Sequence, residues 1–181
     1  RTGYSAIADE WVGIRPGTDG ALLLALIHEI IALGLYDRDF LVRYTNSGQL
    51  VNLDDKHDEF GMFVRTEVPK EEGCYDPQNK LWWDRNSDKP VVTHTEGADP
   101  FLFGEFKLSD GTRVKPAFQL LQERVKDYTP EWASQITGIP VETIRHLAYE
   151  MGITARDETI ELPIAWTDSW GKEHESITGN P

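Results

Sequence analysis

Residues 9–35, DEWVGIRPGTDGALLLALIHEIIALGL, decide the expected fold of this chain. They predict a helix over residues 18–34, with Thr18 as N-cap, Asp19 in the first turn and Gly34 as a left-handed C-cap. Apolar residues occur on nearly every side of this helix, so we expect other elements to cover it on several faces. The apolar run is about 15 residues long, shorter than the roughly 20 that a membrane-spanning helix needs.

The residues before this helix form a candidate ligand-binding turn. A short strand, the Pro16-Gly17 turn and the start of the helix bring free backbone N–H groups and a partial positive charge to one place. Gly17 lets a ligand approach the backbone closely. The carboxylate of Asp19 can accept two N–H donors, such as those of a guanine edge. The alternative interpretation is an ordinary helix start with no ligand.

The composition limits the classes of partner. The 181 residues include 31 Asp and Glu against 18 Lys and Arg, which gives a formal net charge of −13. Nucleic acids and anionic membrane surfaces are bound through clustered Lys and Arg, so both are excluded as expected partners. One cysteine excludes an intrachain disulfide and every cysteine-only zinc or iron–sulfur site within the chain.

The rest of the chain predicts further helices and a hairpin. A short helix is expected after Asp37, with Phe40, Leu41 and Tyr44 on one face. Residues 106–108 and 112–114 flank an Asp-Gly turn and predict a hairpin. Helices are expected over 116–126, 129–138 and 140–152, with Thr129 as the N-cap of the second, and an edge strand over 159–166.

Residues 49–104 are expected to form an acidic, irregular insertion. Twelve acidic and six basic residues lie between positions 54 and 99, among many turn-forming residues. Short strands are expected at 60–65 and 90–95. We interpret the segment as a surface excursion in which Trp82 or Trp83 packs inward as an anchor.

Other candidate residues have a simpler structural interpretation. Cys74 is expected to be a free surface thiol, and His28 a histidine of the core or its edge. The remaining histidines show no shared metal-ligand spacing (His57, His94, His146, His174). Three acidic pairs could be general acids or calcium ligands, but a solvated face is expected (Asp54-Asp55, Asp58-Glu59, Glu71-Glu72). Trp166 and Trp170, with Lys172 and His174, could line a substrate funnel, or pack against the body.

Four stretches resemble the molybdopterin oxidoreductases of the dimethyl sulfoxide reductase family. They are ADEW at 8–11 followed by IRPGTDGAL at 14–22, GLYDRDF at 34–40, YTPEWA at 128–133 and ITGIPVETI at 136–144. Arg1-Thr2 is similar to the tail of the strand that precedes the turn in that family. The chain begins at Arg1 without a signal peptide and ends in turn-forming residues, so we expect it to be a piece of a longer protein.

The resemblance implies a fold and a cofactor. It implies an α/β, helix-rich fragment of a doubly wound cofactor-binding domain, with a β-hairpin and an irregular insertion. We expect residues 1–181 to be one domain fragment, made of 1–48, 49–104, 105–152 and 153–181. The family pattern places one guanosine end of a bis-(molybdopterin guanine dinucleotide) molybdenum cofactor on Pro16, Gly17, Thr18 and Asp19. Arg1 and Arg15 are further candidates.

The resemblance also implies a parent enzyme, with no catalytic residue or metal ligand in this chain. The 4Fe-4S cluster and the molybdenum ligand of the parent are expected outside the chain. The isolated fragment is expected to bind no cofactor. Residues 49–104 and 164–168 look most like family members that act on sulfur compounds. Expected partners are a membrane anchor subunit, an iron–sulfur electron-transfer subunit and the remainder of the catalytic subunit, on either face of a bacterial inner membrane. The alternative function is a non-catalytic acidic protein-interaction module.

Overall fold

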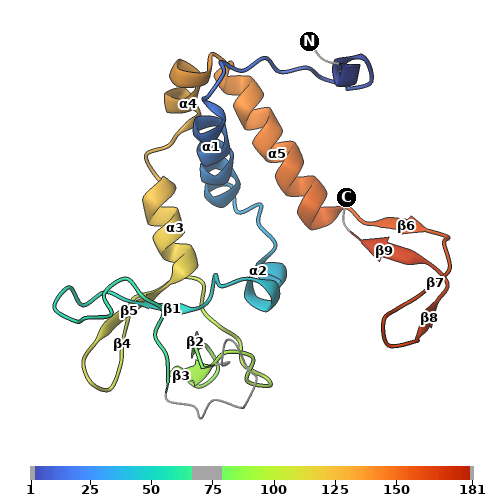
Figure 1. Cartoon of the computed structure of the whole chain (residues 1–181). Helices are drawn as coiled ribbons and strands as arrows, with labels where there is room; N and C mark the ends of the chain where they lie inside the picture. Colours follow the sequence, from blue (N-terminus) through green and yellow to red (C-terminus); the bar gives the residue numbers. More distant parts are fainter. Residues whose placement is uncertain (1–2, 67–78, 180–181) are drawn as a thin grey trace. The chain divides into compact units, whose positions relative to one another are not determined.

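The computed structural model describes residues 3–66 and 79–179. They form helices and small antiparallel sheets (Figure 1). The chain divides into two compact units, one of Arg1–Asp37 with Val125–Pro181 and the other of Arg38–Arg124. We call them the first and the second unit. This mixture confirms the predicted α/β class. The parallel sheet of a doubly wound domain is not formed by the described strands. No helix of the described residues is long and apolar enough to cross a membrane.

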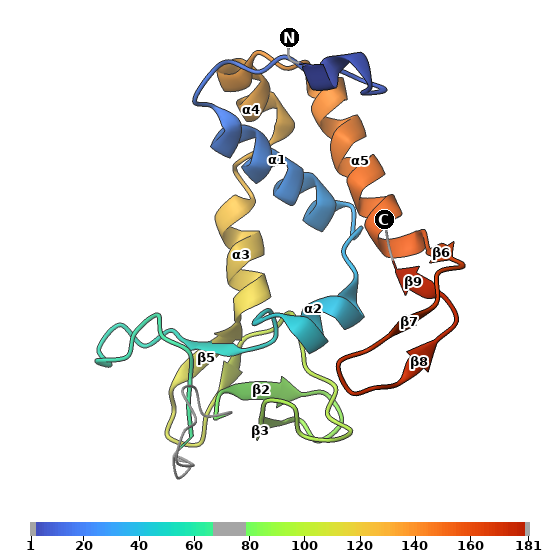
Figure 2. The ribbon, with the colours of Figure 1, turned by 45° about the vertical axis from the view of Figure 1, so that its right-hand side comes forward.

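Three helices build the core of the first unit. After a short 3-10 helix, η1 (Gly3–Ala6), they are α1 (Asp19–Ala32), α4 (Pro130–Thr137) and α5 (Val141–Asp157). Helix α1 packs against both α4 and α5 (Figure 2). The core consists of small and branched apolar side chains from all three helices and the link before α5 (Ala25, Leu26, Ala133, Ile139, Ile144, Ala148). Helix α1 is thus covered on the faces toward α4 and α5, while Leu23 and Leu33 stay more than half exposed among the described residues.

The ends of α1 and α4 largely follow the sequence signals. Gly34 has a φ of +66°, its N–H donates to Ile31 O and the next N–H donates to Ile30 O, which together form a Schellman C-cap. Thr129 accepts a hydrogen bond from Trp132 N as N-cap of α4. The prediction for Thr18 is wrong in one respect. Its hydroxyl donates backwards to Arg15 O at 2.7 Å, so it does not cap α1 through its side chain.

Helix α5 runs five residues past its predicted end at Gly152. Gly152 is buried, and a Cβ built on it would lie 2.6 Å from Leu35 Cβ. The glycine therefore serves a close approach between α5 and the chain after α1, and it does not end the helix. The predicted strand over 159–166 is two strands, β6 (Ile160–Leu162) and β7 (Trp166–Thr167), which pair with β9 (Ile177–Gly179) and β8 (Glu173–His174).

The second unit contains a three-stranded sheet and a separate hairpin. The sheet has the order β1 (Leu50–Asn52), β5 (Arg113–Pro116), β4 (Phe106–Lys107), and its β4–β5 pairing confirms the hairpin predicted around the Asp-Gly turn. The other hairpin pairs β2 (Leu81–Asp84) with β3 (Lys89–Val92). Helices α2 (Arg38–Tyr44) and α3 (Ala117–Val125) flank these strands in sequence.

Residues 49–104 are less peripheral than expected. Trp82 and Trp83 are both buried, as predicted, but Trp83 belongs to a core with Leu50 and Val114. Of the two expected strands, 90–95 is realised as β3, while 60–65 forms only the isolated bridges of Phe63 and Arg65. The segment therefore includes core residues of the second unit.

Phe40 and Tyr44 share one face of α2, as predicted, and both side chains are exposed. Phe40 and Tyr44 are 54 % and 74 % exposed, with ring centroids 5.3 Å apart, while Val42 is the buried residue of the helix. The two rings therefore contact each other at the surface of the second unit instead of filling its core.

Candidate functional site

A tight turn of residues 15–18 precedes α1. Thr18 N donates to Arg15 O at 3.2 Å, and Gly17 at the third position has a φ of +80°. Proline second and a positive φ third are typical of a type II turn, which favours glycine at that position. The turn therefore has a defined conformation before any ligand is considered.

Arg15 attaches this turn to the end of α4. Its backbone N–H donates to Thr137 O at 3.0 Å, and its Nη1 donates to Gln135 O at 2.9 Å and Ile136 O at 3.1 Å. These carbonyls belong to the last turn of α4, where a cation complements the helix dipole. The sequence suggests Arg15 as a cofactor contact. In the structure, Arg15 makes hydrogen bonds that position the turn. Sequence reasoning missed this pairing because the partners lie about 120 positions apart.

The start of α1 offers hydrogen-bonding groups that the described residues leave unused. The N–H groups of Gly17, Asp19 and Gly20 donate to no acceptor in the described part of the chain, and the Asp19 carboxylate accepts no hydrogen bond there. Pro16, Gly17 and Asp19 are exposed. A Cβ at Gly17 or Gly20 would meet no atom within 4 Å. Donors, an acceptor carboxylate and open space therefore lie together at the predicted position.

The other candidate residues form no comparable site. Arg1, Cys74 and the Glu71-Glu72 pair lie outside the described residues. His28 Nδ1 lies 3.0 Å from Val125 O, and His57 Nδ1 accepts from Glu59 N, so both have local backbone partners. No group of three or more His, Cys, Asp or Glu among residues 3–66 and 79–179 is arranged to hold a metal ion.

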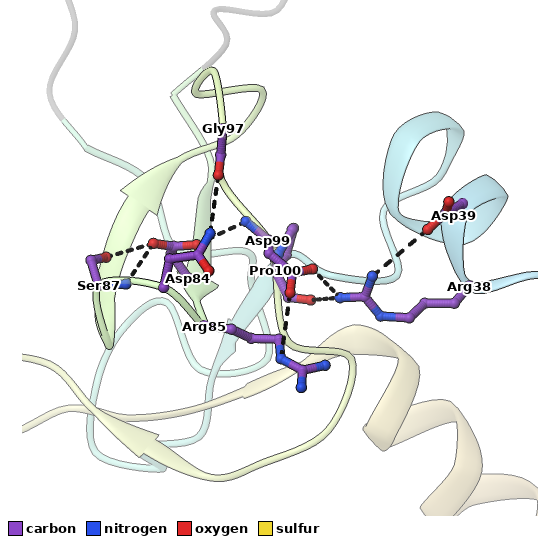
Figure 3. A network of polar contacts seen from close by, with 9 residues as sticks. Arg38, Asp39, Asp84, Arg85, Ser87, Gly97, Asp99 and Pro100 are labelled. Carbon is purple, nitrogen blue, oxygen red and sulfur yellow. Dashed lines mark hydrogen bonds and ion pairs between the residues drawn. The ribbon is translucent and has the colours of Figure 1, made fainter.

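Acidic residues of β2 and the loop after β3 make an internal network (Figure 3). Asp84 is buried and accepts from Ser87 N, Ser87 Oγ and Asp99 N at 2.7 to 2.9 Å. The Ser87 hydroxyl and the Asp99 amide, in that order, are the main causes that lower the pKa of Asp84 from 3.8 to about 2. Asp99 pairs with Arg38 and with Arg85. The hydrogen bonds of Asp84 and the ion pairs of Asp99 therefore hold the loop after β3 in place.

Trp166 and Trp170 do not line a funnel formed by the described residues. Trp166 stacks on His174, with ring centroids 4.5 Å apart, while Trp170 is 89 % exposed. The alternative prediction, packing against the body, therefore does not hold for Trp170 in the described part of the chain.

Comparison with known proteins places the chain in a family. No family model matches it. A subunit of the sulfite dehydrogenase of Allochromatium vinosum is 66 % identical over 181 residues, which is all of this chain and 19 % of that protein. The alpha subunit of the perchlorate reductase of Dechloromonas aromatica is 36 % identical over 170 residues, covering 78 % of this chain and 18 % of that protein. Dimethyl sulfoxide reductase of Haemophilus influenzae is 30 % identical over 168 residues, covering 93 % of this chain and 14 % of that protein.

The chain thus spans less than a fifth of the length of these curated relatives. All three relatives are oxidoreductases by name, and the matches cover most or all of the present chain. The resemblance found in the four sequence stretches is therefore confirmed. The chain belongs to the dimethyl sulfoxide reductase family of molybdopterin oxidoreductases and corresponds to one segment of their catalytic subunits.

Proposed function

We propose that this chain helps to hold the guanosine part of a molybdopterin guanine dinucleotide in a molybdenum-dependent oxidoreductase. The observation that carries the proposal is the start of α1, where the N–H groups of Gly17, Asp19 and Gly20 and the Asp19 carboxylate have no hydrogen-bond partner among the described residues. A Cβ built on Gly17 or Gly20 would meet no atom within 4 Å there. Family membership supports a molybdenum cofactor as the ligand, and its guanosine part is our proposal for this site. The cofactor, when bound, supplies the redox chemistry, and this chain contributes binding and position.

The hydrogen-bonding groups fit a guanine base. Guanine presents N1–H and N2–H₂ as adjacent donors, and one carboxylate can accept from both. Asp19 is exposed at the first turn of α1 and matches that edge. The free N–H groups of Gly17 and Gly20 suit acceptor atoms of the base, ribose or phosphate. Because Arg15 attaches the turn to α4, these groups are held in place before the ligand binds.

Further parts of the proposal concern the parent protein. The molybdenum is held as a bis-(molybdopterin guanine dinucleotide), with its metal ligand and a 4Fe-4S cluster contributed by other segments, and Arg1 is a further contact to the cofactor. The substrate is a sulfur compound, which the 66 % identity to a sulfite dehydrogenase subunit supports. That relative is named as one subunit of its enzyme, which supports an assembly with other subunits. A membrane anchor and an iron–sulfur electron-transfer protein are the subunits that we propose.

The experiment is cofactor retention in the full-length protein. Each charge-assisted hydrogen bond is worth about 1.5–3 kcal/mol, so Asp19→Asn weakens retention of the cofactor by roughly tenfold or more. The readouts are molybdenum and guanine content per polypeptide and the melting temperature. The matched control is Asp39→Asn, the same change in the first turn of α2, which keeps wild-type cofactor content.

A second variant separates binding from folding. Gly17→Val is unsuitable, because the φ of +80° strains the turn whether or not a ligand is present. Gly20→Ala adds a Cβ in open space at a helical position, so it keeps or raises stability while narrowing the space before α1. Full cofactor content in Asp19→Asn would remove Asp19 from the site. Absence of molybdenum and guanine from the folded wild-type protein would favour the non-catalytic interaction module.

A further inference from the structure

Arg15 caps the C-terminal end of α4. The last four carbonyl groups of an α-helix have no partner within the helix, so they need donors from elsewhere. At the end of α4 the first of the four accepts from Gly138 N. The other three accept from the backbone N–H and the Nη1 of Arg15 at 2.9 to 3.1 Å (Gln135 O, Ile136 O, Thr137 O). A residue that precedes α1 thus completes a helix end about 120 positions away.

The end of α4 accommodates this arginine. A Cβ built on Gly138 would lie 3.3 Å from Nε and 3.6 Å from Cζ of Arg15, so the glycine leaves room for the guanidinium. Thr137 is buried, and its hydroxyl donates to Ala133 O at 2.8 Å and accepts from Ile139 N at 3.1 Å. These two bonds fix the backbone whose carbonyl groups Arg15 binds. The guanidinium therefore has a defined place on α4.

Arg15 also holds the residues that lead into α1. Its carbonyl accepts from Thr18 N at 3.2 Å and from Thr18 Oγ1 at 2.7 Å. Thr18 O in turn accepts from Ala21 N at 3.0 Å, and Asp19 lies between these two residues. One residue therefore connects the end of α4 with the start of α1. A movement of Arg15 is passed on to the backbone that carries Asp19.

We propose that Arg15 is a positioning residue of the guanosine site, which fixes the Asp19 carboxylate through the turn and does not itself contact the cofactor. This inference rests on the proposed function, because it concerns how that site is held. The Nη1 of Arg15 is already occupied by two carbonyl groups of α4. A binding group that is ordered beforehand loses less conformational freedom, so the cofactor is held more tightly. The stretch ITGIPVETI at 136–144 then serves the same site as the turn, because it supplies two of the carbonyl groups that Arg15 binds.

Release of molybdenum and guanine from the full-length, cofactor-loaded protein tests the inference. Arg15→Ala is expected to release the cofactor roughly tenfold faster than wild type. Arg15→Lys is expected at an intermediate rate, because an ammonium group lacks the planar fork of the guanidinium. The matched control is Arg145→Ala, another exposed arginine, which bonds Glu131 in the first turn of α4 and keeps the wild-type rate. Melting temperatures confirm that folded proteins are compared, and Arg15→Lys replaces Arg15→Ala if the latter does not fold.

A double-mutant cycle with Asp19→Asn separates positioning from direct contact. If Arg15 acts through Asp19, its replacement in the Asp19→Asn protein changes the release rate by less than about threefold. Effects that multiply in the double variant would show that Arg15 touches the cofactor itself, and would overturn the inference. Wild-type release from the Arg15 variant would overturn it as well, and faster release from Asp19→Asn alone would leave the guanosine site standing. Unchanged release from Asp19→Asn would contradict the guanosine site, and this inference with it.

Discussion

Gly152→Ala tests the packing of α5 against the end of α1. In most helices this substitution is stabilising, by about 1 kcal/mol, because alanine has the higher helix propensity. Here we expect the opposite sign. The added Cβ would lie 2.6 Å from Leu35 Cβ and 3.0 Å from Leu35 Cδ1. Leu35 is 8 % exposed, and its Cβ can move only with the backbone.

The expected magnitude follows from the size of the overlap. Carbon atoms pack at about 3.5–4.0 Å, so relief of the contact requires a shift of roughly 1 Å between two packed segments. Overpacking of this kind costs about 1–3 kcal/mol. After the gain in helix propensity is subtracted, a net loss of about 1 kcal/mol of unfolding free energy remains, equivalent to a fall of about 2–4 °C in melting temperature.

Urea and thermal unfolding of the protein give the measurement. Gly20→Ala is the control, since its Cβ meets no atom within 4 Å, and it is expected to stabilise by about 0.4–1 kcal/mol. Gly152→Ala and Gly20→Ala should therefore shift stability in opposite directions. A Gly152→Ala protein as stable as Gly20→Ala would refute the close approach at Leu35.

Two further predictions concern the second unit. The pKa of Asp84 is lowered to about 2, so its hydrogen bonds stabilise the fold fully above its ordinary value of 3.8 and are lost as the pH falls through about 2. The difference in unfolding free energy between wild type and Asp84→Asn, measured in urea, should therefore shrink from about pH 4 to about pH 2, and a constant difference would contradict it. Trp83→Ala should cost about 3–5 kcal/mol, because Trp83 is buried and stacks on Phe106 at 4.6 Å; unfolding unchanged from wild type would show that Trp83 is peripheral.

The features that the sequence predicts well depend on local chemistry. The N-cap at Thr129, the left-handed Gly34 and the Asp-Gly hairpin each involve residues within a few positions of one another. The turn before α1 was predictable for the same reason, because Pro16-Gly17 restricts the backbone by itself. Its proposed ligand came from the family resemblance.

The features that it misses depend on residues far apart in the chain. Gly152 looks like a helix end until Leu35 is placed against it, and the contacts of Arg15 with α4 join residues about 120 positions apart. Trp83 becomes part of a core only when Leu50 and Val114 assemble around it. These outcomes are decided by tertiary packing, which overrides local propensity.

The division of the first unit into two distant pieces has a consequence for the order of folding. Helix α1 is synthesised first, yet its partners α4 and α5 follow only after residues 38–124, which form the second unit. The second unit can therefore become compact on the ribosome while α1 still has its apolar residues unburied. When the second unit folds, the effective length of the chain between α1 and α4 becomes shorter. A shorter loop has a lower entropic cost of closure. Nascent α1 thus stays without its partners α4 and α5 until both helices have been synthesised.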